Sequence, residues 1–253
     1  MKIVVDTTQD ITQLLSLIFE EIKKADENAD ALLENFIVIS GTGIKTRKII
    51  ARIISNFIIE KYEKTIGFDY IKPFELLKDD AIKILNCLCE DKNLKKNRLE
   101  LIEKDVLDII SSGHINIDGV VKFRLEEYKK ELQFTLDLLI DEFSAKKSYD
   151  EFIGLMKYFT EIQPAVTDTV VIQETLGEYN LTDISGKPID LKFDEEFADE
   201  LMPFSLTGED LLISNLMAAM PEKIIFNNID EKKPIINTIK QIFEGRISNG
   251  KEF

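Results

Sequence analysis

The sequence predicts an α+β fold: a small αβ module at the amino terminus, a helical middle with a long central helix, and an αβ module at the carboxy terminus. Three patterns predict it. Short apolar runs alternate with helix-spaced apolar positions in residues 1–70, helical spacing dominates residues 71–165, and short Val- and Ile-rich runs return from residue 166 onward. We expect domain boundaries where these patterns change, which gives domains 1–70, 71–165 and 166–253.

The amino-terminal module is predicted to alternate strands and helices. A strand at Ile3–Val5 is followed by a helix at Asp10–Ala25, and a strand at Phe36–Ile39 by a helix at Lys45–Lys64. Isoleucine alone favours strands, but the isoleucines of the last segment recur on one helical face over a run too long for one strand. We therefore predict a helix whose isoleucine face lies on the small sheet.

The middle region is predicted to be almost entirely helical. One helix begins near Asp79 and Asp80, whose carboxylates suit the positive end of a helix dipole, and another covers Asn93–Ile110. The longest helix is predicted to begin at Asp118, which can accept hydrogen bonds from the free N–H groups of the first turn. A separate helix that follows it is expected to end before Pro164.

The long helix is predicted to be the structural spine, because it is apolar on two sides. A helix of this kind is typically sandwiched between layers. The main stripe contains Val121, Leu125, Tyr128, Leu132, Leu136, Leu139, Ile140 and Phe143, and the thinner one contains Phe123, Phe134 and Leu138.

The carboxy-terminal module is predicted to contain strands and helices in alternation. Thr207 is expected to cap a helix that ends at Met220, and a strand–helix–strand order of this length favours parallel pairing by a right-handed crossover. The predicted strands are Thr169–Gln173, Glu178–Leu181 and Lys223–Phe226, and Pro234–Glu244 is the last predicted helix.

The charge of the chain bears on its partners. The net charge is −15, and residues 166–253 contain 8 Lys and Arg against 17 Asp and Glu, a net −9. Such a field repels phosphate backbones and anionic lipids, so we expect neither nucleic acid nor membrane as a partner. The two densest basic groups are flanked by acids and are interpreted as solvated helix faces. They are Lys92, Lys95, Lys96 and Arg98, and Lys45, Arg47, Lys48 and Arg52.

Cysteine and histidine usage indicates a reduced protein without a metal or other cofactor. Cys87 and Cys89 are two residues apart in a helical run, so they cannot bridge each other and are interpreted as packing residues. A reactive or metal-binding thiol is the alternative, but His114 is the only histidine and zinc needs about four ligands. An acid at position 6 precedes any apolar run long enough for a secretory signal, and we expect a cytoplasmic location.

The loop between the second strand and its helix is a candidate anion site. It contains Gly41, Gly43, Lys45 and Thr46, and backbone N–H groups at a helix start can bind an anion. The loop lacks the spacing of a Walker motif and the third glycine of a dinucleotide fingerprint. A plain strand-to-helix turn is the alternative interpretation.

No catalytic constellation is evident, so we expect no enzyme. His114 is the only possible imidazole base, and the neighbouring serines lack the context of a nucleophile elbow. An acidic cluster could collect a cation but lacks the pattern of a calcium loop, so it is interpreted as a solvated face. The cluster contains Asp194, Glu195, Glu196, Asp199 and Glu200.

Five short sequence motifs in the middle of the chain resemble those of a known family. They are INIDG at 115–119, FRLEEY at 123–128, DEF at 141–143, YDEFIGLMKYF at 149–159 and EIQ at 161–163. With the Val-rich strand that follows, they resemble the YtxC-like family of sporulation proteins from endospore-forming bacteria. The resemblance is best over 116–163 and looser up to Gly245. It implies a setting in sporulation and no particular reaction.

The resemblance also directs attention to one surface. Arg124 lies inside the motif FRLEEY, where it could pair with Glu127, reach Asp118 or contact a partner. Tyr128, Tyr158 and Gln163 could share its surface. We expect a non-enzymatic accessory or interaction protein of sporulation with an unidentified protein partner. The alternative is a small-ligand-binding protein or enzyme with a site at the Gly41–Gly43 loop or in the carboxy-terminal module.

Overall fold

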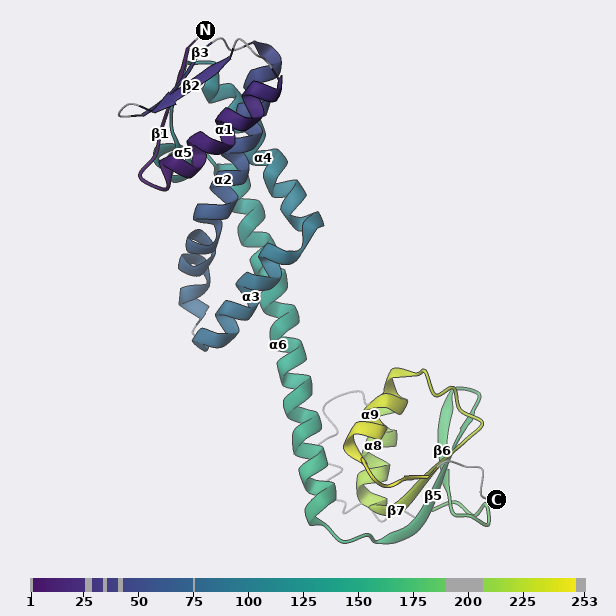
Figure 1. The fold of residues 1–253 in the computed structure, drawn as a ribbon. Helices are drawn as coiled ribbons and strands as arrows, with labels where there is room; N and C mark the ends of the chain where they lie inside the picture. Colours follow the sequence, from purple (N-terminus) through teal and green to yellow (C-terminus); the bar gives the residue numbers. More distant parts are fainter. Residues whose placement is uncertain are drawn as a thin grey trace. The chain divides into compact units, whose positions relative to one another are not determined.

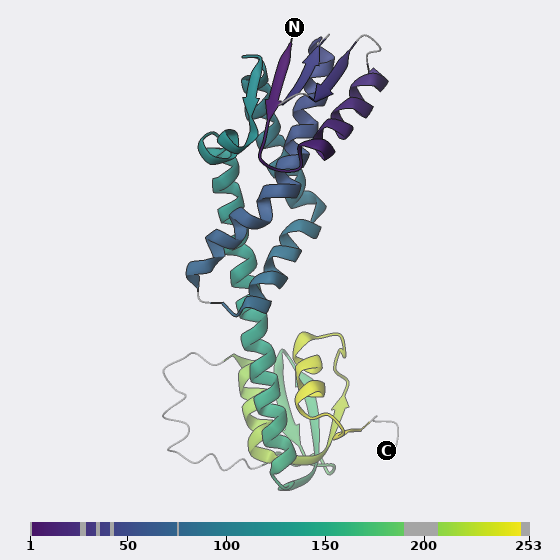
Figure 2. The ribbon, with the colours of Figure 1, turned by 60° about the vertical axis from the view of Figure 1, so that its left-hand side comes forward.

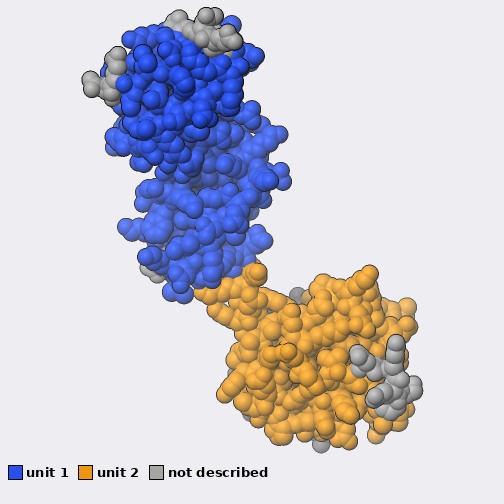
Figure 3. All heavy atoms as spheres, viewed as in Figure 1, with its two compact units in different colours: residues 1–144 blue, residues 145–253 orange. Residues whose placement is uncertain are grey.

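The computed structural model describes residues 2–25, 29–33, 36–40, 43–74, 76–189 and 207–248. The chain forms two compact units, residues 1–144 and residues 145–253, coloured blue and orange in Figure 3. Helix α6, Glu126–Ile162, continues from unit 1 into unit 2. The predicted α+β class is confirmed, with a four-stranded sheet in each unit and a helical middle (Figure 1). The division at residues 70 and 165 stays a prediction, since contacts measure compactness and not independent folding.

The sheet of unit 1 combines both strand directions. Its order is β2-β3-β1-β4, with β1 antiparallel to β3 and parallel to β4. Two of its strands were not predicted, because β2 contains an acid and only four residues, and β4 has only three. The strands are β1 Ile3–Asp6, β2 Asp30–Leu33, β3 Ile37–Ser40 and β4 His114–Asn116.

The helices of unit 1 share one apolar core with this sheet. Ile3 and Val5 of the sheet belong to the same buried cluster as Leu88 and Leu132 of the helical region. Helix α2 extends beyond the predicted end at Lys64 because its buried positions continue to its last residue. The helices are α1 Ile11–Ala25, α2 Ile44–Ile71, α3 Lys78–Glu90 and α4 Lys92–Ile110, with a 3-10 turn at Lys72–Phe74.

The predicted start of the long helix is wrong. A short helix, α5 Ile117–Phe123, precedes α6, and the chain leaves helical geometry at Arg124 and Leu125. Asn116 caps α5, since its Oδ1 accepts from the Gly119 N–H at 2.7 Å. Near this break the backbone carbonyl of Lys122 accepts a hydrogen bond from the Lys129 side-chain ammonium at 2.8 Å, in place of a backbone N–H of the helix. Asp118 has other partners, described below.

The two apolar stripes have different environments. The main stripe is confirmed as core: Leu125, Tyr128, Leu132 and Leu136 are almost completely buried. The thinner stripe is exposed, so the prediction of a helix sandwiched between layers is wrong. Helix α6 also continues into the segment that was expected to form a separate helix, because residues 144–148 contain no glycine or proline that would end it.

Unit 2 has a sheet with helices on one face. The sheet order is β6-β5-β7-β8, and the predicted parallel pairing is confirmed between β5 and β7. Alternation along β5 directs Val170 and Ile172 into the core, while Val171 and Gln173 lie on the other face. The elements are β5 Thr167–Thr175, β6 Glu178–Thr182, α8 Gly208–Ala219, β7 Pro221–Asn227, α9 Pro234–Ile242 and β8 Ile247–Ser248.

The predicted cap of α8 is confirmed as a full capping box. The Thr207 hydroxyl accepts from the Asp210 N–H, and the Asp210 carboxylate accepts from the Thr207 N–H at 2.9 Å. Within the described residues, every helix is too short or too polar to cross a membrane.

Residues 145–162 of α6 add a further helix to unit 2. Ile153 and Met156 pack against its core, and the Thr160 hydroxyl donates to the Ile242 carbonyl of α9 at 3.0 Å. Figures 1 and 2 place α8 and α9 between this part of α6 and the sheet. One side of α6 is therefore fixed on unit 2, and the opposite side faces outward.

Candidate functional site

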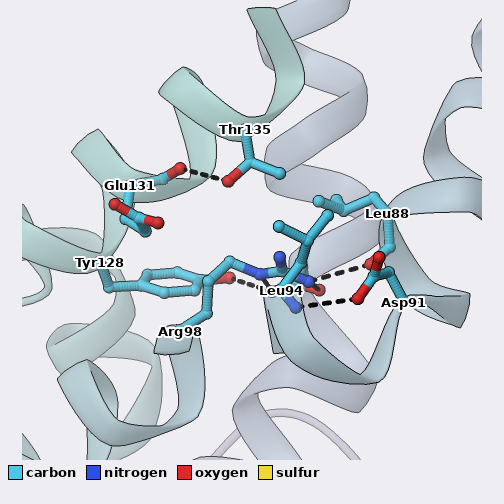
Figure 4. Close-up of polar contacts among 8 residues, drawn as sticks. Leu88, Asp91, Leu94, Arg98, Tyr128, Glu131 and Thr135 are labelled. Atoms are coloured by element: carbon cyan, nitrogen blue, oxygen red, sulfur yellow. Dashed lines mark hydrogen bonds and ion pairs between the residues drawn. The ribbon is translucent and has the colours of Figure 1, made fainter. Parts of the chain in front are cut away.

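A buried charged cluster joins three helices of unit 1. Arg98 of α4 donates from Nε and Nη2 to the two carboxylate oxygens of Glu63 of α2, at 2.9 and 3.0 Å. The Tyr128 hydroxyl of α6 donates to Glu63 at 3.1 Å, and Arg98 Nη2 also donates to the Leu88 carbonyl. In Figure 4 the Tyr128 hydroxyl lies next to the Arg98 side chain, whose guanidinium extends toward Leu88. All three ionisable groups are fully buried, so the interpretation of Arg98 as part of a solvated face is wrong.

The electrostatics of this cluster indicate a structural role. Burial and the negative charge of Glu63 raise the pKa of Tyr128, so the phenol stays a donor. Burial and the same carboxylate raise the pKa of the nearby Cys89 thiol, which disfavours a reactive thiolate. Arg98 Nη1 is buried without a hydrogen-bond partner among the described residues. The geometry fixes α2, α4 and α6 in one register and brings no group to the surface.

A second polar network lies where β1 and β4 end, at the edge where ligands bind in many α/β sheets. The Asp118 carboxylate accepts from the Thr8 N–H and hydroxyl, each at 2.7 Å, and from the Tyr62 hydroxyl at 2.8 Å. Asn116 Nδ2 donates to Asp6 at 3.0 Å. Burial and the hydrogen bond to Asp118 raise the pKa of Tyr62 to about 12. These groups satisfy one another and tie β1, α2 and α5 together.

The predicted anion-site residues do not share one surface. Gly41 lies outside the described residues. Gly43 and Lys45 are exposed at the start of α2, but Thr46 is buried. Gly43 caps α2 with an extended backbone and without a side-chain cap. Whether an anion binds here stays a prediction.

The other predicted chemistry-bearing residues are scattered. The acidic cluster at 194–200 lies outside the described residues. Cys87 is exposed, so its interpretation as a packing residue is wrong, whereas Cys89 is partly buried. His114 is exposed on β4. Within the ranges that the structure describes, no group of three or more His, Cys, Asp or Glu side chains could hold a metal ion.

The predicted interaction residues divide between the two units. Arg124 is exposed at the end of α5, while Tyr128 lies in the core and cannot contact a partner. Glu127 pairs with Lys104 at 3.2 Å, and not with Arg124 as expected. Tyr158 and Gln163 are both exposed and belong to unit 2. Tyr128 is therefore excluded from the predicted surface, and whether the other three residues share one stays a prediction.

Tyr158 belongs to an exposed apolar surface that sequence reasoning missed. We call it the α6 face: Phe152, Leu155, Tyr158, Phe159, Ile162 and Val166, with exposed fractions of 41, 51, 57, 36, 56 and 76%. Large aromatic and aliphatic side chains gathered on one side of a helix are typical of interaction surfaces. The signal was present in the sequence, since apolar residues occur on two sides of this helix, but periodicity does not say which side is covered.

A pocket of about 320 Å³ lies on the opposite side of unit 2, where Val171 and Gln173 face away from the helices. The Thr182 hydroxyl beside it is buried without a partner among the described residues. The lining also offers two amides, from Gln173 and Asn227. The full lining is Val171, Gln173, Thr182, Asp183, Ile184, Gly186, Ile225, Phe226 and Asn227.

Thr182→Val should stabilise the protein by about 1 kcal/mol. The substitution keeps the shape of the side chain and removes a buried hydroxyl whose desolvation is not compensated. Urea unfolding followed by circular dichroism measures the change. Thr175→Val, at the solvent-exposed end of β5, is the control and should change the free energy of unfolding by less than about 0.5 kcal/mol. A destabilised Thr182→Val protein would show that water or another group already satisfies the hydroxyl.

Comparison with known proteins gives one match. The model of the YtxC-like family matches residues 48–248. This range extends well beyond the segment 116–163 that carries the resemblance, and it contains the buried Glu63–Arg98–Tyr128 cluster and the whole α6 face. The comparisons with curated proteins and with solved structures return no match.

Proposed function

Because the chain belongs to the YtxC-like family, we propose that it is a non-enzymatic accessory protein of sporulation, which acts in the cytoplasm by binding another protein chain through the α6 face. The observation that carries the proposal is the exposure of that face. Five large apolar side chains stand in solvent on one side of α6, whose other side is fixed to unit 2, and Val166 follows just beyond the end of the helix. Covering such a surface releases water and is favourable by roughly 25 cal/mol per Å².

The two polar networks of unit 1 support a non-enzymatic role. Catalytic groups need a substrate within reach, but Glu63, Arg98 and Tyr128 are sealed in the core. Asp118 is partly open, yet its carboxylate already accepts three hydrogen bonds from Thr8 and Tyr62. Both networks hold elements of the fold in position, which accounts for their geometry without a reaction.

Spore formation by complemented cells tests the proposal. In an endospore-forming host that lacks this chain, we expect wild-type protein to restore the yield of heat-resistant spores and Phe159→Asp to fail. A carboxylate in the centre of the α6 face has to be desolvated when the face is covered, which opposes binding. Counting heat-resistant colonies measures the effect.

The matched control is Leu176→Asp, which should restore spores fully. Leu176 is also apolar and completely exposed, but it lies in the β5–β6 turn, away from α6. Equal thermal unfolding of both variants, by circular dichroism, shows that Phe159→Asp is folded. Restoration by Phe159→Asp would remove the α6 face from the function, and normal sporulation without the chain would remove the sporulation setting.

A second candidate function is small-ligand binding in unit 2. It is favoured by the pocket with its two amides and the unpartnered Thr182 hydroxyl, which suit an uncharged ligand with hydrogen-bonding groups. The same assay separates the two functions. If the function is ligand binding, Asn227→Leu should fail to restore heat-resistant spores and Phe159→Asp should restore them. If the function is partner binding, the reverse is expected. The Gly41–Gly43 loop is the other place for such a site, with Gly43→Asp as its test variant.

A further inference from the structure

We propose that the partner covering the α6 face is a second copy of this chain, with the two α6 helices packed antiparallel about a two-fold axis. The inference rests on the proposed function, since it uses the same face. It specifies the occupant, the orientation and the residues that meet.

The spacing of the face is that of a helix-pairing seam. Phe152, Leu155, Phe159 and Ile162 follow one another at intervals of three, four and three residues, which are the a and d positions of two consecutive heptads. All four are exposed. Side chains with this spacing fit into the gaps between those of a facing helix, whereas a flat protein surface needs no such period.

The seam is also complementary to itself. Phe152 and Ile162 lie five residues before and after Lys157, and Leu155 and Phe159 lie two residues before and after it. A two-fold axis on the seam side of α6, at the level of residue 157 along the helix, therefore places Phe152 against Ile162 of the second copy and Leu155 against Phe159 of the second copy. The Lys157 side chain is on the other side of the helix, where it pairs with Glu244. Such a closed, isologous contact is the commonest interface of soluble oligomers.

The exposed area is sufficient for a dimer. With about 200 Å² for a fully exposed large side chain, the exposed fractions of the α6 face amount to about 600 Å² per copy. Two copies would then bury about 1,200 Å², which exceeds the roughly 1,000 Å² expected of a specific interface. This area includes Val166, which lies beyond the end of α6, so the contact has to cover the segment 163–166 as well as the helix.

The residues at the edges of the seam favour a second copy of this chain over a different partner that carries charged residues. Of the residues that border it, Tyr149, Met156, Tyr158 and Gln163 are uncharged, and Glu151 is the exception. Pairing helices that select a different partner usually carry charges of both signs at these positions. Unit 2 nevertheless has 11 Lys and Arg against 20 Asp and Glu, a net −9, so two copies repel at long range.

That repulsion gives the dimer a characteristic salt dependence. Salt screens the net charges and leaves the apolar contact intact, so dimerisation should tighten between about 0.05 M and about 0.5 M salt. The binding of a basic partner to the same face would instead become weaker over this range of salt concentration. Analytical ultracentrifugation of the full chain at micromolar concentration should show twice the monomer mass of 29.0 kDa at the higher salt.

Two variants locate the contact. Phe159→Asp should weaken the dimer at least about 100-fold, while Leu176→Asp leaves it unchanged. A Tyr158→Cys protein without its native thiols, Cys87→Ser and Cys89→Ser, should cross-link to a dimer with a short bis-maleimide, because position 158 faces its own copy next to the axis. Leu176→Cys in the same background should not. Matching circular dichroism melts show that all variants are folded.

The outcomes separate this inference from the proposed function. A monomeric wild type at both salt concentrations, or a dimer that Phe159→Asp leaves intact, overturns the inference. If the wild type is monomeric and Phe159→Asp still fails to restore spores, the face binds a different protein and the proposed function stands. If the dimer forms but Phe159→Asp restores spores, the inference stands and the proposed function falls.

Discussion

Arg98→Met should destabilise the protein by about 3–5 kcal/mol. The substitution removes the guanidinium but leaves Glu63 buried, and among the described residues the Tyr128 hydroxyl is then the one remaining donor to its carboxylate. Desolvating a carboxylate without a counter-ion is far more costly than losing an exposed ion pair. Urea unfolding monitored by circular dichroism at neutral pH gives the free-energy difference.

Removing the whole cluster should restore most of that loss. In the triple variant Glu63→Leu, Arg98→Met, Tyr128→Phe, no charge remains in this cluster and apolar groups of similar volume fill the site, which is often neutral or stabilising. The surface pair is the control: Lys104→Met breaks the exposed contact with Glu127 and should cost less than about 1 kcal/mol. If the triple variant is no more stable than Arg98→Met, packing and not the isolated charge is responsible.

Asp118→Ala should destabilise the protein by about 2–3 kcal/mol, because three donors lose a charged acceptor. Burial alone would raise the pKa of Asp118, but the hydrogen bonds from Thr8 and Tyr62 hold it below its ordinary value. A carboxyl whose pKa is lower in the folded state stabilises the fold above its unfolded pKa. That contribution disappears as the pH falls through the folded value.

The pH dependence distinguishes the charge from the packing of Asp118. The stability difference between wild type and Asp118→Asn should be full at pH 7 and shrink as the pH falls below about 4, where the unfolded carboxyl takes up a proton. Asp108→Asn is the control, because Asp108 lies on the exposed side of α4. A difference that is constant with pH would show that the ionised form of Asp118 contributes nothing.

Much of the secondary structure could be predicted because it depends on local spacing. The buried stripe through Leu125, Leu132 and Leu136 has a helical period that any chain must satisfy to cover a core. The capping box of Thr207 and Asp210 is likewise contained within four residues. The parallel pairing of β5 and β7 follows from the strand–helix–strand order, which leaves few topologies.

The choice between equivalent local signals could not be predicted. Asn116 and Asp118 are both good capping residues two positions apart, and Asn116 caps α5 because Thr8 and Tyr62, distant in sequence, occupy the Asp118 carboxylate. Arg98 lies in a basic run typical of a solvated face. It is buried because Glu63, 35 residues away, lies opposite it. The edge strands β2 and β4 were too short for a local pattern.

In the candidate site, too, some features could be predicted from the sequence and others could not. The sequence by itself predicted helices over both parts of α6, with apolar residues on two sides of the first part, since hydrophobic period is a property of the chain. Only the tertiary structure decided which side faces solvent: the side with Ile153 and Met156 packs in unit 2, and Phe152, Leu155 and Phe159 remain outside. The physical reason is that burial depends on which distant segments cover a surface, and the helical period of α6 contains no information about those segments.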